Sequence, residues 1–189
     1  CEKNSSYSQN TYNFSDGFVR NFHHAHLNGE FANASLKGCF FLKDKNVCSN
    51  KTNIIHNAEH CVSDQTYKGI LNNQSKANYY SNTFVAENAQ KTEGYQLSKG
   101  ILLTDNCSFF SKPELRIFAD DVKCSHGSTI GPVDKSALYY LRSRGINKNE
   151  AMKMIISSFI EEDLQNLDKN IAERVSRGLS DYLANLVND

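Results

Sequence analysis

Lys68-Gly69-Ile70-Leu71 is the most informative motif of this chain, because similar four-residue motifs precede and follow it at a fixed interval. These are Lys37-Gly38-Cys39-Phe40 before it and Lys99-Gly100-Ile101-Leu102 after it, so Gly38, Gly69 and Gly100 are evenly spaced, and Gly131 extends the series by the same step. Periods of about 20–50 residues are typical of solenoids and arrays, in which each repeat packs on its neighbours. Short echoes also arise by coincidence, so the content of the intervening segments decides between the two.

The segments between these motifs have the composition of β-strands. They are rich in Ile, Val, Phe, Tyr and Thr, they alternate with period two, and Asn, Gly, Ser or Asp interrupts them. The strand-like segments are Phe14–Leu27, Asn53–His60, Lys76–Ala86, Ser108–Ile117 and Asp121–Thr129. Strands with a fixed repeat stack into a β-helix, where each coil covers the edge of the coil before it. A repeat as long as this one has room for a full coil of several short strands.

A helical region is predicted after Gly131-Pro132, where the repeat ends. Asp134 is placed to cap a short helix that runs through Arg142 and ends at Gly145. A solenoid needs a cap over the exposed apolar face of its last coil. We therefore expect the helices to pack on the solenoid and on each other.

Two longer helices follow in this prediction. Asn147, with Glu150 three residues later, resembles a capping box that starts the second helix, and the third begins at about Asp168. The apolar faces predicted from helical spacing are Ala151, Met154, Ile155 and Phe159 on the second helix, and Ile171, Val175, Leu179, Leu183 and Leu186 on the third. Mixed charges such as Glu173, Arg174 and Arg177 occupy the opposite side of the third helix.

The charge balance argues against nucleic acid and membrane as partners. The chain of 189 residues carries 21 basic and 21 acidic side chains and has no basic run that would attract phosphate. No apolar stretch approaches the roughly 18 residues that span a bilayer.

The cysteines indicate free thiols. Six are spread along the chain without Cys-x-x-Cys spacing, at Cys1, Cys39, Cys48, Cys61, Cys107 and Cys124. The paired close ligands of structural zinc are absent, and no signal peptide is visible, so a reducing compartment is expected.

Cys124 and His126 are the candidate metal ligands. They lie two residues apart on an expected strand, so their side chains share one face. A thiolate and an imidazole suit iron or an iron–sulfur cluster, but two ligands are too few for a closed site. The alternative is that Cys124 is a small apolar filler and His126 a hydrogen-bonded interface residue.

The remaining histidines receive structural interpretations. On a strand, the side chains of His24 and His26 share one face and that of His23 lies on the other. We interpret this segment as a surface strand rather than a metal site. His56 and His60 lie in a turn-rich segment, where packing or a turn hydrogen bond is expected.

Several of these motifs together resemble the SufB/SufD family, whose members help to assemble iron–sulfur clusters. The longest is Phe118-Ala119-Asp120-Asp121-Val122-Lys123-Cys124-Ser125-His126-Gly127-Ser128-Thr129-Ile130-Gly131, followed by Tyr139-Tyr140-Leu141-Arg142-Ser143-Arg144-Gly145-Ile146. Two upstream runs also resemble the family, His60-Cys61-Val62-Ser63-Asp64-Gln65-Thr66-Tyr67-Lys68-Gly69 and Asn88-Ala89-Gln90-Lys91-Thr92. Lys123-Cys124-Ser125-His126-Gly127 is similar to the SufD branch, because SufB proteins carry a Glu-His-Glu-Ala type run there.

The resemblance implies a mainly β fold, a right-handed parallel β-helix followed by a C-terminal helical region. The expected division is residues 1–131 for the later coils of the β-helix and 132–189 for the helices. Family members are roughly twice this length, so the resemblance also implies that an N-terminal half is missing.

The resemblance further implies a non-catalytic scaffold subunit. It would pair with a SufB-type subunit, or with a second copy, and dock a SufC-type ATPase through its helical tail. His126 would lie at the junction opposite a SufB cysteine, where iron or an iron–sulfur cluster is held transiently rather than bound stably by this chain alone. The implied location is a bacterial cytoplasm or a plastid-type organelle.

Two other classes remain as alternatives. A β-helix carbohydrate-active enzyme would need acidic and basic residues clustered on one strand face, which the sequence does not show. A passive solenoid adaptor would differ only in having no role for Cys124 and His126. The chain has no Gly-x-x-x-x-Gly-Lys-Ser/Thr loop, so ATP hydrolysis would belong to a partner.

Overall fold

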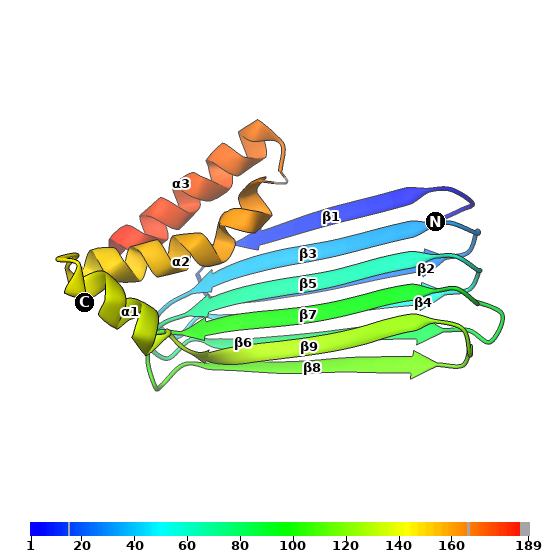
Figure 1. Ribbon diagram of the computed structural model, residues 1–189, viewed down its shortest axis with the longest axis horizontal. Coiled ribbons are helices and arrows are strands. Elements are labelled where there is room, and N and C mark those ends of the chain that lie inside the picture. The colour runs from blue at the N-terminus through cyan, green and yellow to red at the C-terminus, as the bar shows by residue number, and fades with distance from the viewer. Residues whose placement is uncertain (15, 166, 186–189) are drawn as a thin grey trace.

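The computed structural model describes residues 1–14, 16–165 and 167–185 as a β-solenoid followed by three helices (Figure 1). One sheet contains the odd-numbered strands β1 (Ser6–Asn13), β3 (Asn33–Leu42), β5 (Val62–Leu71), β7 (Glu93–Leu102) and β9 (Lys123–Pro132). The other contains β2 (Phe18–Leu27), β4 (Val47–His56), β6 (Lys76–Val85) and β8 (Ser108–Ile117). Every strand pair within each sheet is parallel.

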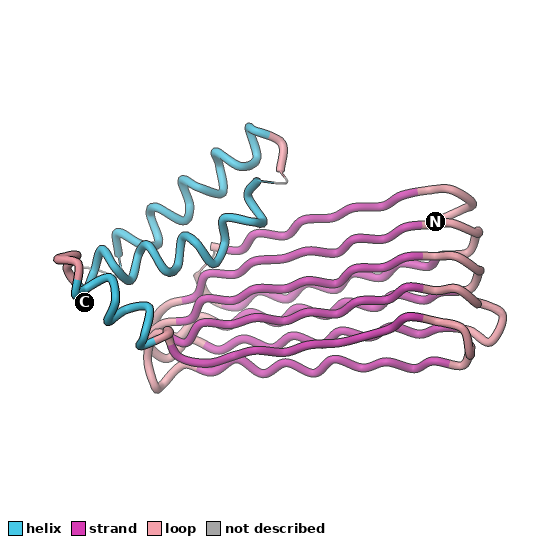
Figure 2. The backbone as a smooth tube through the Cα atoms, viewed as in Figure 1, coloured by secondary structure: helices cyan, strands magenta, loops and turns pink. Residues whose placement is uncertain are grey.

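Each coil consists of one strand from each sheet, joined by turns that stack at the two ends (Figure 2). In Figure 1 the odd-numbered strands run leftward in front, the even-numbered strands run rightward behind, and the chain descends from β1 to β9. This sense of winding is right-handed. The expected parallel β-helix is therefore confirmed, although a coil contains two long strands rather than several short ones.

The strand register shows that the evenly spaced glycines do not all occupy equivalent positions in successive coils. Gly69 pairs with Gly100, as the repeat predicts. Gly38 instead pairs with Tyr67, and Gly100 pairs with Ile130 rather than Gly131. Within the odd-numbered sheet the step from one coil to the next is therefore not constant, being shortest from β1 to β3 and longest from β5 to β7. The prediction that the glycines occupy equivalent positions is therefore confirmed for Gly69 and Gly100, and it is wrong for Gly38 and Gly131.

Aromatic rings explain why glycine is needed at the inward positions. A Cβ on Gly38 would lie 2.2 Å from Cε1 of Tyr67, and one on Gly69 would lie 2.2 Å from Cε2 of Phe40. Rings from the two sheets meet inside the coils, since Tyr67 of β5 stacks on Tyr79 of β6 with centroids 4.3 Å apart. A register shift of two residues keeps every side chain on its face, so the rings fill the space above each glycine without inverting the strand.

The helices begin and end close to the predicted positions. They are α1 (Lys135–Ser143), α2 (Lys148–Gln165) and α3 (Lys169–Asn185). The Asp134 carboxylate accepts hydrogen bonds from the backbone N–H groups of Ser136 and Ala137, at 2.8 and 3.4 Å. Asn147 Oδ1 accepts from the N–H of Glu150 at 3.0 Å, and Asp168 Oδ1 caps α3 at the N–H of Asn170.

The buried face of α2 differs from the predicted one. Ala151 is buried as expected, but the other buried residues are Ile156 and Ile160, whereas Met154 is 48% exposed. Ile155 and Phe159 are partly buried. Apolar residues lie on several sides of this helix, so their spacing does not select one face.

The apolar face of α3 is largely as predicted. Val175, Leu179 and Leu183 are buried, but Ile171 is 47% exposed. Leu186 lies outside the described residues.

The helices do not cover the last coil. Ile156 and Ile160 of α2 and Leu179 of α3 pack against Phe41 of β3 and Ile70 of β5, on the outer surface of the odd-numbered sheet. Figure 1 shows α2 and α3 beside the ends of β1 and β3, at the opposite side of the sheet from β9. The expectation that the helices pack on the solenoid is correct, but the expectation of an end cap is wrong.

In the described part of the chain, no helix has the length and apolar character needed to cross a membrane.

Candidate functional site at the open end of the solenoid

The last coil, formed by β8 and β9, leaves one end of the solenoid open. In the described residues β9 pairs only with β7, and β8 pairs only with β6. All residues of β9 are therefore exposed or partly exposed, whereas most residues of β5, in the middle of the same sheet, are buried. An edge strand of this kind presents unpaired N–H and C=O groups to a partner.

Cys124 and His126 both lie on the inward-facing side of β9. Cys124 pairs with Gly94 and His126 pairs with Gln96, and both of these β7 residues face the buried interior. Because residues two apart on a strand share a face, the structure brings the two candidate ligands together at the mouth of the open coil. Cys124 is half-buried there and His126 is exposed.

The surroundings of Cys124 are mostly apolar. Its side chain packs at the edge of a cluster formed by Val85, Ala89 and Ala119. A Cβ on Gly94 would lie 3.2 Å from Cys124 Sγ, so the glycine leaves room for the sulfur. Burial raises the pKa of the Cys124 thiol, and a hydrogen bond with the Gly94 backbone partly offsets this effect. The sulfur is therefore protonated at neutral pH, and a metal ion would have to displace that proton.

A band of polar side chains crosses the interior and reaches the open end beside His126. Gln96 Nε2 donates to Thr83 Oγ1 at 2.8 Å and to the Glu114 carbonyl at 3.2 Å. Ser98 Oγ lies 2.6 Å from Ser111 Oγ, and it donates to Ser128 Oγ of β9 at 2.9 Å. The oxygen Oε1 of Gln96 is buried without a hydrogen-bond partner in the described structure.

Sequence reasoning did not assign this band to the site. The available signal was Gln65 and Gln96, which occupy the same position of the sequence repeat and pair in the structure. Gln65 Nε2 also donates to Thr83 Oγ1, at 2.7 Å. The band makes the floor of the open coil polar on the side of His126 and apolar on the side of Cys124.

Within the described residues, no group of three or more His, Cys, Asp or Glu side chains is arranged to hold a metal ion. Two candidate donors are too few for a closed metal site. A thiolate and an imidazole fit iron or a cluster edge chemically, but any further ligands must come from outside this part of the chain.

The outer-face histidines of β2 lie far along the chain from this pair. His24 and His26 share the outer face, with their rings stacked 4.5 Å apart. Burial and the neighbouring His26 lower the pKa of His24. His23 points to the other face, where its Nε2 lies 3.4 Å from Thr11 Oγ1.

The two later histidines have structural surroundings. His56 is fully buried, its Nε2 lies 2.8 Å from Ser63 Oγ, and burial lowers its pKa to about 4. His60 occupies a corner with φ of 58°, and its ring stacks on Phe31 at 4.8 Å.

The parallel β-solenoid with an open last coil agrees with the family to which the sequence is similar. Residues 1–159 match the family model described as SUF system FeS cluster assembly, SufBD core domain. The chain therefore belongs to the SufBD family.

Within that family the chain is SufD-like. It is 37% identical over 150 residues to the iron–sulfur cluster assembly protein SufD of Escherichia coli, covering 79% of this chain and 36% of that protein. It is 34% identical over 126 residues to the SufBD family protein slr0076 of Synechocystis, covering 67% of this chain and 28% of that protein. The chloroplastic protein ABCI7 of Arabidopsis thaliana is 38% identical over 105 residues, covering 55% of this chain and 22% of its own length. The chain thus spans about a third of the E. coli relative.

Proposed function

We propose that this chain forms part of a non-catalytic scaffold subunit in iron–sulfur cluster assembly. The observation that carries the proposal is the exposed His126 beside Cys124 at the mouth of an open coil, in a chain of the SufBD family. An incomplete donor pair at an open edge suits a site shared between two chains. Iron or a nascent cluster is the cargo of such a site and is held there transiently.

The partner at the open end is proposed to be a SufB-type subunit, or a second copy of this chain. The unpaired edges of β8 and β9 offer backbone hydrogen bonds along ten residues each. A facing chain would cover the polar band and supply the ligands that Cys124 and His126 lack.

The helices are proposed to dock a SufC-type ATPase. Helix α1 buries none of its residues, and Tyr139 and Tyr140 are 77% and 58% exposed. Exposed aromatic rings of this kind are favoured at the centre of protein interfaces. ATP hydrolysis would belong to that partner, whose motion would open the SufB-type junction through differential contacts in its two states.

The location that we propose for this role is a bacterial cytoplasm or a plastid-type organelle, since one relative is a protein of the bacterium E. coli and another is named as chloroplastic. No specific observation favours a carbohydrate-active enzyme. A passive adaptor remains as an outcome of the test below.

The deciding experiment replaces His126 with Ala in the natural full-length protein. We expect the complex with SufB- and SufC-type partners to persist, because one ring contributes little to an extensive interface. We expect growth of a Suf-dependent strain to fall sharply, because solvent does not replace an imidazole ligand. His24→Ala, which removes an exposed ring from the outer face of β2, is the matched control and should leave growth unchanged.

The other outcomes separate the roles of the two ligands. Cys124→Ala should have a smaller effect on growth than His126→Ala, since its sulfur packs on an apolar cluster. Normal growth of the His126→Ala strain would contradict a ligand role for His126 and would favour the alternative of a passive adaptor. Loss of the complex together with growth would make His126 an interface residue only.

A second test addresses the helices. Tyr139→Glu and Met154→Glu place charges on exposed positions of α1 and α2, and each should weaken co-purification of the ATPase by on the order of tenfold. Tyr95→Glu changes a partly exposed tyrosine on β7 and serves as the control. Unchanged recovery of the ATPase with both helix variants would place the docking surface elsewhere.

A further inference from the structure

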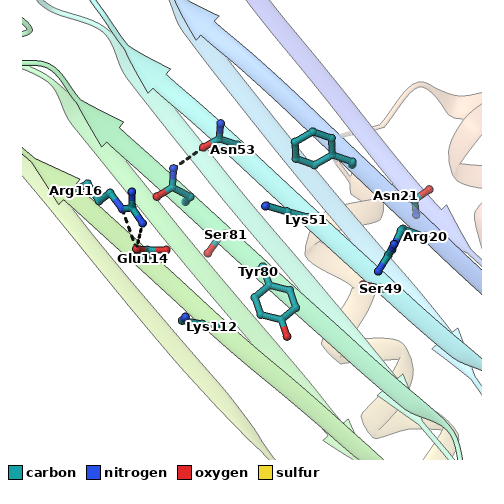
Figure 3. A pocket seen from close by; sticks show the side chains of 12 residues that line it. Arg20, Asn21, Ser49, Lys51, Asn53, Tyr80, Ser81, Lys112, Glu114 and Arg116 are labelled. Atoms are coloured by element: carbon teal, nitrogen blue, oxygen red, sulfur yellow. Dashed lines mark hydrogen bonds and ion pairs between the residues drawn. The ribbon is translucent and has the colours of Figure 1, made fainter.

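The outer face of the even-numbered sheet carries a groove that the function proposed above does not use. It is a hollow of about 810 Å³ that extends across β2, β4, β6 and β8. Figure 3 shows Lys51, Tyr80 and Lys112 rising from three neighbouring strands of this groove. This face is distinct from the helix-covered face of the odd-numbered sheet and from the open coil.

The groove concentrates positive charge. Its lining includes four cations, Arg20, Lys51, Lys112 and Arg116, and one carboxylate, Glu114. Glu114 is bound by Arg116, whose Nε and Nη2 lie 2.9 and 2.7 Å from Glu114 Oε1. The whole chain has no net charge, so this face is strongly biased toward attracting anionic groups.

Aromatic rings alternate with these cations. The register places Phe22, Lys51, Tyr80 and Lys112 side by side on successive strands. Lys51 Nζ lies 5.5 Å from the centroid of the Phe22 ring, and the rings of Tyr80 and Phe110 are 5.8 Å apart. Phe22 and Phe110 are 58% and 52% exposed. Rings gathered on one face are the composition of an interface rather than of an ordinary solvated surface.

The polar groups of the groove suit a polypeptide better than a nucleic acid. On the outer face, the Asn82 amide donates to the Oδ1 of Asn53 on the neighbouring strand. These two side chains form a short ladder of amides, which have both donors and acceptors for peptide groups. The Glu114 carboxylate would repel a continuous phosphate backbone, whereas separated carboxylates can pair with Lys51 and Lys112 and avoid it.

We propose that this groove binds an acidic, partly apolar polypeptide segment that lies across the strands. Its carboxylates pair with Lys51 and Lys112, and its apolar side chains pack on Phe22 and Tyr80. The amide ladder contacts its backbone. The proposal rests on the outer face alone and stands whether or not His126 binds iron.

The probe is a fluorescent twelve-residue peptide of alternating Glu and Leu, with a peptide of alternating Gln and Leu as its neutral counterpart. Binding to the natural full-length protein is followed by fluorescence anisotropy at low and high salt. Lys51→Gln/Lys112→Gln should weaken binding of the acidic peptide about tenfold, because two exposed charge pairs are lost. Lys37→Gln/Lys99→Gln makes the same charge change on the other sheet and should leave binding unchanged.

Three outcomes would overturn the proposal. One is equal binding of the acidic and neutral peptides, and another is equal binding by the two double variants. The third is tighter binding of a twelve-nucleotide oligouridine than of the acidic peptide, which would make the groove a single-stranded RNA surface. The exposed Lys→Gln changes leave the core untouched, so a loss of peptide binding would not reflect unfolding.

Discussion

Gly69 illustrates how a single residue is constrained by the coil next to it. Its inward face is filled by the Phe40 ring, which is itself 1% exposed. The constraint is therefore one of space, since Gly69 does not have a positive φ. Gly131, the last member of the same series, has no atom within 4 Å of a Cβ position and also lacks a positive φ.

The two glycines should respond differently to replacement by Ala. Gly69→Ala should lower the free energy of unfolding by about 1–3 kcal/mol, because a buried ring must leave its position. Gly131→Ala should be neutral or stabilise slightly, by up to about 1 kcal/mol, because it restricts only the unfolded chain. Urea unfolding followed by circular dichroism measures both. Equal stability of the two variants would mean that the Phe40 ring adapts at no cost.

Among the helices, α2 is attached to the solenoid through a buried ion pair. Lys68 points outward from β5, and its Nζ lies 2.7 Å from Asp163 Oδ2 and 3.0 Å from the Phe159 carbonyl. The Lys68 side chain is only 6% exposed, so the pair is largely removed from water. Lys99 pairs with Lys68 in the register but is partly exposed.

Lys68→Met should destabilise the protein by about 3 kcal/mol, because it leaves the Asp163 carboxylate without its partner in a largely buried position. Lys68→Met/Asp163→Leu should recover most of this loss, since neither charge then remains. Lys99→Met is the control and should change stability by less than about 0.5 kcal/mol. Thermal unfolding measures the effect, and hydrogen exchange in α2 locates it. Equal values for Lys68→Met and Lys99→Met would contradict the anchoring role.

Across the molecule as a whole, the cysteine thiols differ in their accessibility to solvent, so their reactivity can be used to find which surfaces are covered. Cys39, Cys48, Cys61 and Cys107 are buried, whereas Cys124 is half-buried at the open coil. Cys39 lies beneath the helices, and burial raises its pKa well above the usual range. Only exposed thiolate reacts readily with alkylating agents.

We expect N-ethylmaleimide to modify Cys124 much faster than the four buried thiols in the folded protein, as read by mass spectrometry of peptides. Addition of a SufB-type partner should slow modification of Cys124 if that partner covers the open coil as proposed above. Cys48 is the internal control, since it is buried with or without the partner. Unchanged modification of Cys124 in a purified complex would mean that the junction lies elsewhere.

Much of the fold follows from local sequence. The alternation in segments such as 76–86 and 108–117 predicts strands, because it reflects the two faces of a pleated backbone. Asp134, Asn147 and Asp168 predict the helix starts, because capping satisfies N–H groups within three residues. The shared face of Cys124 and His126 is determined in the same way, by a spacing of two on one strand.

The remaining features depend on contacts between distant segments, which no local pattern encodes. The two-residue offset of Gly38 arises because the Tyr67 ring of the next coil fills its space. The helices lie over β3 and β5, so Lys68 is buried and the equivalent Lys99 is not. The groove combines Phe22, Lys51 and Lys112 from strands that only the register aligns. Local hydrogen bonding fixes each element, but the packing of side chains between coils selects the register, the helix position and the surfaces that remain open.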